Sequence, residues 1–359
     1  TANRRQRQMC IRDRKKASKK KKNLQTEAYV KLRDTSMDDW LMQLGRGEKP
    51  PNEEQKKFLS CVVDRCKQEH QSLGAPVPRR GGRKKGALKD EPLRCCLMGI
   101  PGAGKSTCIE YMRRLFEDCL GWEDGVQFQF LASQNTMAAL IGGQTIHSWG
   151  GIPINATQAN AKVGTKGADG DIDELFQKAL GIRWIVIDEV STVSPSLLGL
   201  LDSYLRRACL RHPYAYRGRE QRPFGGINVV FAGDFWQLPP VKQISIYTNP
   251  FTADTSTEEQ RALKMFWIPE DPDGIQKTFV LTVPMRTTDK WLRAVLDVKR
   301  DGKESWEIYC FIHGLPTRNV GTWLPEEDEP WCKNPTCATL RDGKWAEIFP
   351  RGRGNIDNW

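Results

Sequence analysis

The feature that most constrains this chain is a glycine-rich segment at residues 99–107, Gly-Ile-Pro-Gly-Ala-Gly-Lys-Ser-Thr, which fits the pattern G-x-x-x-x-G-K-[ST]. A short apolar run at residues 93–98 precedes it, and a helical pattern follows it to about Cys119. The glycines let the backbone wrap around a chain of phosphates, so that successive amides and the helix N-terminus point at it. The segment therefore predicts a strand, a phosphate-binding turn and a helix, which form the core of a P-loop fold.

The side chains of this turn predict its ligands, ATP and Mg²⁺. Lys105 would reach the β- and γ-phosphates, and the Ser106 hydroxyl would coordinate Mg²⁺. The other residues predicted to contact ATP here are Gly99, Pro101, Gly102, Ala103, Gly104 and Thr107.

A second signal lies farther along the chain, where an apolar run at residues 184–187 ends in Asp188-Glu189. Two acids after an apolar strand are most often structural when they stand alone. In a chain that also has a P-loop, a carboxylate at the end of a neighbouring strand can hold the Mg²⁺, and we assign this role to Asp188. Glu189 is then positioned to activate the attacking water.

Apolar runs and helical patterns alternate through the central part of the chain. Further strands are expected at residues 126–132, 184–187 and 227–232, and helices at residues 134–141 and 195–209. The run at residues 184–187 lacks polar alternation, as expected when both faces of a strand are covered. The pattern predicts an α/β fold with a doubly wound parallel sheet.

The positive charge of the chain is concentrated in one segment. The net charge is +11, and residues 1–22 contain eleven Arg or Lys residues against one acid, Asp13. Such a run cannot bury apolar surface and is expected to be disordered. A solvated tail, a nuclear-import signal that binds an import receptor, and an arm that binds nucleic-acid phosphates all remain open for it.

The remaining composition narrows the class of protein. A chain of 359 residues with 39% hydrophobic and 28% charged residues can fold into two domains. No apolar run approaches the roughly 18 residues of a membrane span, so membrane insertion is not expected. Eleven cysteines, with Cys95 and Cys96 adjacent, favour free thiols in a reducing compartment over a disulfide framework.

Several separate motifs, taken in order, resemble the PIF-type and RecD-like DNA helicases of superfamily 1B. Asn52-Glu53-Glu54-Gln55 looks like the Q motif of that family, which implies that Gln55 reads the adenine. Asp188-Glu189-Val190-Ser191 is similar to the family's Asp-Glu-Ile-Ser. The resemblance covers about residues 50–303 and implies RecA-like motor domains.

Two later motifs supply the remaining catalytic candidates. Residues 233–241, Gly-Asp-Phe-Trp-Gln-Leu-Pro-Pro-Val, look like the family's third motif, which implies that Gln237 senses the γ-phosphate. Leu281-Thr282, Met285-Arg286 and Asp289 resemble the fourth motif and make Arg286 the arginine finger. An arginine that stabilises the charge of the transition state can contribute ~10³–10⁵ in rate.

Residues 132–149 resemble the family's single-strand-binding segment, which ends in Gly-Gly-x-Thr-Ile-His-Ser. Hydroxyls and backbone amides of this segment can bond DNA phosphates. The predicted DNA-binding residues are Ser133, Asn135, Thr136, Thr145, His147 and Ser148. The family has Pro-Thr-Gly or Ser-Thr-Gly where this chain has Ser133-Gln134-Asn135, so the contacts at this point stay open. His147 could also be a structural hydrogen-bonding residue, and Trp149 and Trp236 could stack on bases or belong to the core.

Three domains are expected. They are a basic arm and helix at residues 1–49, a first RecA-like ATPase domain at 50–245, and a partial second RecA-like domain at 246–359. The first domain would contain a basic linker at 74–90 and an insertion at 150–181. No Ser-Gln-Gly or Ala-Leu-Ser-Arg segment of the family's last motifs follows Arg286, so the chain is expected to stop within its second motor domain. Zinc-ligand spacings occur at Cys310, His313, Cys332 and Cys337, for which coincidence is the expected explanation.

The sequence thus predicts an ATP-dependent helicase or translocase on single-stranded DNA. A monomer and a nuclear or mitochondrial location are expected, and 5′-to-3′ polarity is implied by the resemblance alone. We expect this chain to bind ATP but to unwind duplex poorly or not at all. A truncated, non-processive nucleotide- and DNA-binding module remains an alternative. A P-loop kinase is the other alternative, against which residues 233–241 and Arg286 argue.

Overall fold

The structure is a computed structural model that describes residues 37–47, 49–74, 90–153, 168–251, 254–268, 270–285 and 296–302. The chain divides into two compact units, of which the first comprises Thr1–Ile100 and Gly104–Thr282. The second comprises Pro101–Ala103 and Val283–Trp359. All elements named below belong to the first unit. No described helix is both long enough and apolar enough to cross a membrane.

The first unit is built on a sheet of six parallel strands in the order β3-β2-β4-β7-β1-β8. The strands are β1 (Arg94–Gly99), β2 (Phe128–Ala132), β3 (Gln144–Thr145), β4 (Trp184–Asp188), β7 (Asn228–Gly233) and β8 (Lys277–Leu281). A separate antiparallel pair consists of β5 (Tyr216–Arg217) and β6 (Glu220–Gln221). The parallel sheet confirms the predicted α/β fold class.

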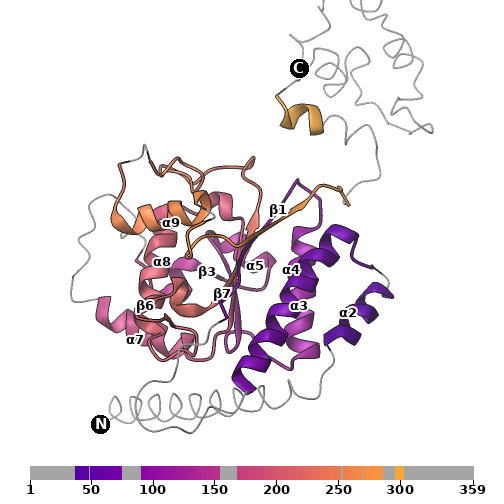
Figure 1. Ribbon diagram of the computed structural model, residues 1–359. Coiled ribbons are helices and arrows are strands. Elements are labelled where there is room, and N and C mark those ends of the chain that lie inside the picture. Colours follow the sequence, from indigo (N-terminus) through magenta and orange to yellow (C-terminus); the bar gives the residue numbers. More distant parts are fainter. Residues whose placement is uncertain are drawn as a thin grey trace, which may run out of the picture. The chain divides into compact units, whose positions relative to one another are not determined.

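Helices cover both faces of this sheet (Figure 1). One face carries α3 (Glu53–Gly74) and α4 (Lys105–Arg114), which a π-helical turn, Leu115–Cys119, continues. The other face carries α7 (Ala168–Ala179), α8 (Pro195–Ala208) and α9 (Thr257–Trp267). The remaining helices are α2 (Met37–Gly45), which contacts α3, and the short α5 (Asn135–Leu140) and α6 (Ile146–Gly150). Short 3-10 turns occur at Val190–Thr192 and Pro223–Gly226.

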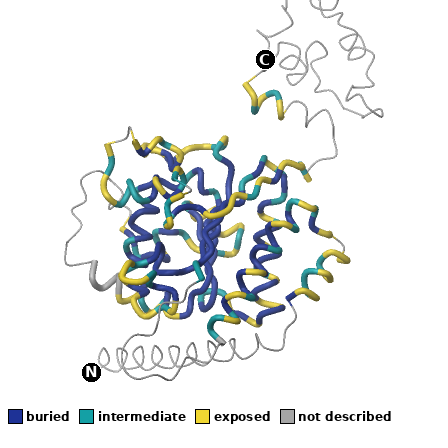
Figure 2. The backbone as a smooth tube through the Cα atoms, in the orientation of Figure 1, coloured by how far each residue is buried: buried dark blue, intermediate teal, exposed yellow. Residues whose placement is uncertain are grey.

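The central strands are buried on both faces (Figure 2), which explains why apolar residues predominate in them. On the α3 and α4 side, the Phe116 ring packs against Phe128 and Trp184, with ring centroids 5.1 and 5.6 Å away. On the opposite side, Leu198 and Leu201 of α8 join one apolar core with Phe231 of β7. Helix and sheet therefore share a continuous core on each face.

A buried network of polar side chains fixes the C-terminal half of α3 to the amino ends of the strands. Glu69 Oε1 accepts hydrogen bonds from Arg183 (2.7 Å), Asn228 (2.7 Å) and Arg65 (3.1 Å). Asn228 Oδ1 accepts from Arg65 Nε (2.9 Å) and from the backbone amide of Leu93 (2.7 Å). Glu69 therefore ties α3 directly to Arg183 and Asn228, at the starts of β4 and β7, and Asn228 extends the network to Leu93, just before β1.

Several features differ from the sequence expectations or extend them. Helix α7 falls within the segment predicted as an insertion, yet Leu175 and Ala179 of this helix belong to the core. The compact unit continues past residue 245 to Thr282, because β8 pairs with β1 and completes the sheet. The domain limits drawn from the sequence stay a prediction. The basic segment 1–22 and most of the linker at 74–90 lie outside the described residues.

Candidate nucleotide and DNA site

Three adjacent strands deliver the predicted nucleotide residues to one edge of the sheet. In the register, Met98 of β1 faces Gly233 of β7, and Ile187 of β4 faces Phe231 of β7. The segments that follow these strands therefore start side by side, at a strand spacing of about 4.8 Å. This edge is the carboxyl edge of the sheet, where parallel α/β folds bind their ligands.

Lys105 is the first residue of α4 and is buried, with 8% of its surface exposed. Its ammonium group donates hydrogen bonds to the carbonyl oxygens of Gly99 (2.8 Å) and Ile100 (3.4 Å). Gly104, which precedes it, has a φ of 89°, a left-handed conformation that favours glycine. A Cβ at Gly104 would also lie 2.4 Å from Nε2 of Gln55. The left-handed φ is therefore the reason why the turn needs glycine here, and a Cβ would in addition displace the end of the Gln55 side chain.

Asp188 lies at the end of β4 and is 6% exposed. Burial raises its pKa from 3.8 to about 6; a hydrogen bond from the Glu189 amide to Oδ1 (3.0 Å) opposes this rise. The Glu189 carboxylate raises the pKa of Asp188 further, whereas the Lys105 ammonium lowers it. The structure thus brings Lys105, Asp188 and Glu189 into one electrostatic environment. A shielded carboxylate with a raised pKa is a group that gains from a bound cation.

Glu189 has a left-handed backbone, with φ 51° and ψ 48°, which is uncommon for a residue with a side chain. Its carbonyl oxygen accepts hydrogen bonds from the Thr192 amide (3.0 Å) and the Thr192 hydroxyl (2.8 Å). A Cβ at Gly233 would lie 2.9 Å from the Val190 amide nitrogen, so the end of β7 presses against this turn. The surrounding backbone therefore holds Glu189 in its strained conformation.

Gln237 follows β7 in a tight turn, in which its amide donates to the Asp234 carbonyl (3.0 Å). Because β7 lies between β1 and β4, this turn starts between the glycine-rich segment and Asp188. The Gln237 side chain is half-buried and makes no hydrogen bond within the part of the chain that the structure describes. Arg286, the predicted arginine finger, lies outside the described residues.

The first turn of α3 meets the P-loop directly. Asn52 and Gln55 cap each other, since Asn52 Oδ1 accepts from the Gln55 amide (2.8 Å) and Gln55 Oε1 accepts from the Asn52 amide (3.0 Å). Gln55 Nε2 then donates to the Gly104 carbonyl (3.4 Å). The buried Nδ2 of Asn52 has no hydrogen-bond partner among the residues that the structure describes, which leaves one buried donor at this position. The sequence had singled out Gln55 but not Asn52.

The predicted DNA segment follows β2 and β3 at the same edge of the sheet. Ala132 of β2 pairs with both Asp188 of β4 and Thr145 of β3, so Ser133 and Thr145 leave adjacent strands. The Thr192 hydroxyl uses its hydrogen on the Glu189 carbonyl, so Ser133, 2.5 Å from Thr192 Oγ1, is the donor of that bond. A predicted DNA residue is therefore connected to the Glu189 turn.

The other predicted DNA residues occupy two short helices. Asn135 and Thr136 are exposed in the first turn of α5. The Thr145 hydroxyl accepts from the Ser148 amide (3.1 Å) and so caps α6. His147 Nδ1 lies 3.0 Å from the Ile152 carbonyl and donates to it. One ring nitrogen of His147 is therefore used in a hydrogen bond within the protein, and only Nε2 is left as a nitrogen that could contact DNA.

Comparison with known proteins supports the interpretation of this edge. Residues 86–264 match the family described as PIF1-like helicase. The chain belongs to the PIF1-like helicase family. It is 31% identical over 224 residues to the ATP-dependent DNA helicase RRM3 of Saccharomyces cerevisiae, which covers 60% of this chain and 26% of that protein. It is 29% identical over 219 residues to the ATP-dependent DNA helicase Pif1 of Bdellovibrio bacteriovorus, which covers 60% of this chain and 42% of that protein.

Among solved structures, a crystal structure of Pif1 helicase from Candida albicans is 22% identical with a TM-score of 0.48, and covers 77% of this chain and 49% of that chain. A crystal structure of Pif1 helicase from Bacteroides in complex with ADP-AlF3 and ssDNA is 21% identical, with a TM-score of 0.47. The match covers 84% of this chain and 58% of that chain. This member of the PIF1-like family thus spans less than half the length of the curated relatives above.

The two tryptophans that the sequence left open have different environments. Trp149 is 1% exposed and belongs to the core, so it is not available for stacking on bases. Trp236, one residue before Gln237, is 76% exposed. The four residues with zinc-ligand spacing, Cys310 to Cys337, lie outside the described residues, and the described part of the chain contains no group of three potential metal ligands.

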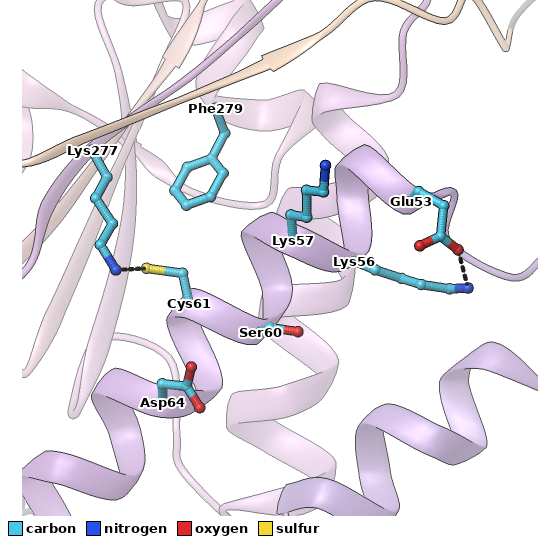
Figure 3. Close-up of a pocket in the computed structure, with 8 residues that line it drawn as sticks. All are labelled: Glu53, Lys56, Lys57, Ser60, Cys61, Asp64, Lys277 and Phe279. Carbon is cyan, nitrogen blue, oxygen red and sulfur yellow. Dashed lines mark hydrogen bonds and ion pairs between the residues drawn. The ribbon is translucent and has the colours of Figure 1, made fainter.

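A pocket of about 450 Å³ opens between α3 and β8 (Figure 3), and residues 99–107 are not part of its lining. It is lined by Glu53, Lys56, Lys57, Ser60, Cys61, Asp64, Lys277 and Phe279. Figure 3 shows the Lys277 ammonium bonded to the Cys61 sulfur (3.4 Å) and Lys56 turned to Glu53 (2.7 Å). None of these residues was predicted to bind a ligand.

Proposed function

We propose that this chain is the ATP-hydrolysing motor core of a DNA helicase that moves along single-stranded DNA. The observation that carries the proposal is the convergence of Lys105, Asp188 and Glu189 at one sheet edge, within a chain of the PIF1-like helicase family. The relatives named above are ATP-dependent DNA helicases, and one solved relative is a complex with ssDNA. The 5′-to-3′ polarity and a monomeric state are part of the proposal.

The residues at the edge fit a magnesium nucleotide. A buried ammonium at Lys105 and a buried carboxylate at Asp188 offer opposite charges to phosphates and a cation. Asp188 and the Ser106 hydroxyl would hold Mg²⁺, which supplies positive charge against the phosphate oxygens. The buried Nδ2 of Asn52 offers a further donor to the nucleotide.

Each remaining side chain has a proposed task in hydrolysis. Lys105 binds the β- and γ-phosphates, and the Glu189 carboxylate takes the proton of the attacking water. Gln237 reports the loss of the γ-phosphate through its turn, and Arg286 stabilises the charge that develops during transfer. Gln55 holds the turn at Gly104 and faces the adenine side of the nucleotide.

Single-stranded DNA is the proposed partner of the segment after β2. Ser133, Asn135, Thr136, Thr145, His147 and Ser148 would contact its phosphates, with help from backbone amides. These residues lie at the same edge as Asp188 and Glu189. A location in the nucleus or in the mitochondrion, with residues 1–22 as an arm for nucleic acid or an import receptor, completes the proposal.

ATP hydrolysis measured with and without single-stranded DNA tests the function. We expect hydrolysis that DNA stimulates and that Lys105→Ala abolishes. An exchange in the C-terminal half of α3, Lys67→Ala, serves as the matched control because Lys67 forms an ion pair with the exposed Asp38 on α2. Turnover that persists in Lys105→Ala contradicts the assignment of the P-loop. Hydrolysis that DNA does not change, together with transfer of phosphate to a small molecule, would support a kinase instead.

A further inference from the structure

Two adjacent residues in the first turn of α3 contact different parts of the nucleotide edge. Gln55 donates to the Gly104 carbonyl at 3.4 Å. The Glu54 carboxylate accepts two hydrogen bonds from one residue, Thr282, whose amide lies 2.8 Å from Oε2 and whose hydroxyl lies 2.5 Å from Oε1. These partners are 228 positions apart in the chain. One turn of helix therefore holds both the P-loop and the end of β8.

Thr282 is the last residue of the first compact unit. Val283 begins the longer of the two segments that make up the second unit. Immediately before Thr282, Leu281 pairs with Gly99, and its carbonyl accepts from the Ile100 amide (3.3 Å). Within the second unit, the Met285 amide donates to the Gly102 carbonyl (2.7 Å). The chain passes from the first unit to the second between Thr282 and Val283. On each side of this junction, it bonds to the part of the glycine-rich turn that belongs to the same unit.

The C-terminal half of α3 is held in place by buried hydrogen bonds. Glu69 and Arg65 anchor it to Arg183 and Asn228, at the starts of two strands. A helix of 22 residues is about 33 Å long, so α3 runs the length of the sheet. Because the C-terminal half of α3 is anchored, the position of Glu54 in its first turn is fixed relative to the sheet, and so is the position of the Thr282 that it binds.

We propose that Glu54 is a positioning residue that keeps the junction at Thr282 in register with the phosphate-binding turn. The inference rests on the proposed function. Motors couple hydrolysis to the movement of one unit relative to another, and a few residues at the ends of elements absorb that movement. Glu54 holds Thr282, where the first unit ends, while its neighbour Gln55 contacts the carbonyl of Gly104 in the glycine-rich turn.

Steady-state ATP hydrolysis tests this role. Misplacement of a group by about 1 Å can cost 10²-fold in rate, so Glu54→Ala should lower kcat by about 10- to 100-fold. KM for ATP should change little, because Lys105 and the glycine-rich turn are untouched. Glu54→Gln should restore most of kcat, since its amide can accept from the Thr282 amide and donate to the hydroxyl. Glu53→Ala is the matched control, because this neighbouring carboxylate is exposed and pairs with Lys56 (Figure 3).

A double-mutant cycle separates this contact from a general loss of stability. Thr282→Val removes the hydroxyl and should lower kcat less than Glu54→Ala does. The double variant should lose no more than Glu54→Ala alone, because the carboxylate that the hydroxyl bonds is already gone. Additive losses, or a lowered melting temperature with unchanged kcat, would overturn the proposal.

Amide hydrogen exchange at residue 282 provides a readout that does not need hydrolysis. Exchange should be faster in Glu54→Ala than in the wild type and in Glu54→Gln. A wild-type chain that hydrolyses no ATP would contradict the proposed function, and the exchange rates would still decide the role of Glu54. Equal exchange in the wild type and Glu54→Ala overturns the inference; faster exchange in the variant supports it.

Discussion

Removal of the Glu69 carboxylate should be among the most destabilising single changes in the described residues. Its Oε1 accepts three hydrogen bonds, from Arg65, Arg183 and Asn228, and only 5% of its side chain is exposed. Glu69→Ala leaves the Arg183 guanidinium buried without its carboxylate, and breaking a buried pair in this way costs about 3–5 kcal/mol. Glu69→Gln keeps an acceptor and loses only the charge, so its effect should be smaller.

The predicted loss is large enough to measure by thermal unfolding. For a unit of this size, each kcal/mol lowers the melting temperature by about 2–4 °C, so Glu69→Ala should lower it by about 6–20 °C. Circular dichroism on heating, with urea unfolding as a second method, would give the order wild type, Glu69→Gln, Glu69→Ala. Glu53→Gln, on the exposed side of the same helix, should match the wild type. If Glu69→Ala unfolds at the wild-type temperature, the network does not anchor α3.

Two further predictions concern the P-loop and the buried histidine. Gly104→Ala should weaken ATP binding by at least 10-fold in KM or Kd, since its Cβ would meet Gln55 and the left-handed φ of 89° disfavours alanine; an unchanged KM would refute the steric argument. Burial, and then the Arg183 charge, hold the pKa of His212 well below 6.5, so the folded state keeps this ring neutral while the unfolded state binds a proton as the pH falls. Stability should therefore decline below about pH 6.5, by at most about 1.4 kcal/mol per pH unit for this group, and His212→Gln should lessen that slope in urea unfolding at pH 7.5, 6.5 and 5.5.

The sequence predicts best those parts of the molecule whose chemistry is local. The glycine-rich turn and the Asp188-Glu189 pair occupy short, contiguous segments, and each follows a strand in which apolar residues predominate. Strand β8 was not predicted because it lies at the edge of the sheet, where Lys277, Thr278 and Val280 are exposed and the apolar run is only three residues long, Phe279-Val280-Leu281. A pattern that identifies strands buried on both faces cannot find such an edge strand.

Contacts between distant segments could not be predicted from the sequence either, because several of them depend on the unpredicted strand β8. The role of Gly99 depends on β8, because a Cβ there would lie 2.9 Å from the Leu281 side chain and carbonyl. The Glu54–Thr282 contact likewise depends on β8, since Thr282 directly follows Leu281, which pairs with Gly99 of β1. The left-handed backbone of Glu189 has no sequence signal, since glycine or asparagine would be the usual residue in that conformation. Resemblance singled out the motifs, and the packing shows how their segments meet.

Ser133 offers a last test of how the DNA segment and the nucleotide edge are connected. Its hydroxyl donates to Thr192, which donates to the carbonyl of Glu189, so Ser133 supports the turn that holds the proposed base. One hydrogen bond contributes about 0.5–1.5 kcal/mol, and its loss in Ser133→Ala should lower the DNA-free rate of ATP hydrolysis by about 2- to 12-fold. Gln134→Ala is the control, because this exposed neighbour does not cap α5 with its side chain.

The alternative outcome is equally specific. A residue that only contacts DNA would leave the DNA-free rate unchanged in Ser133→Ala and raise the DNA concentration needed for half-maximal stimulation. Support of the Glu189 turn instead lowers the rate at every DNA concentration. Because the bond to Thr192 is made inside the protein, we expect the second pattern, and a normal DNA-free rate in Ser133→Ala would refute the connection between the two sites.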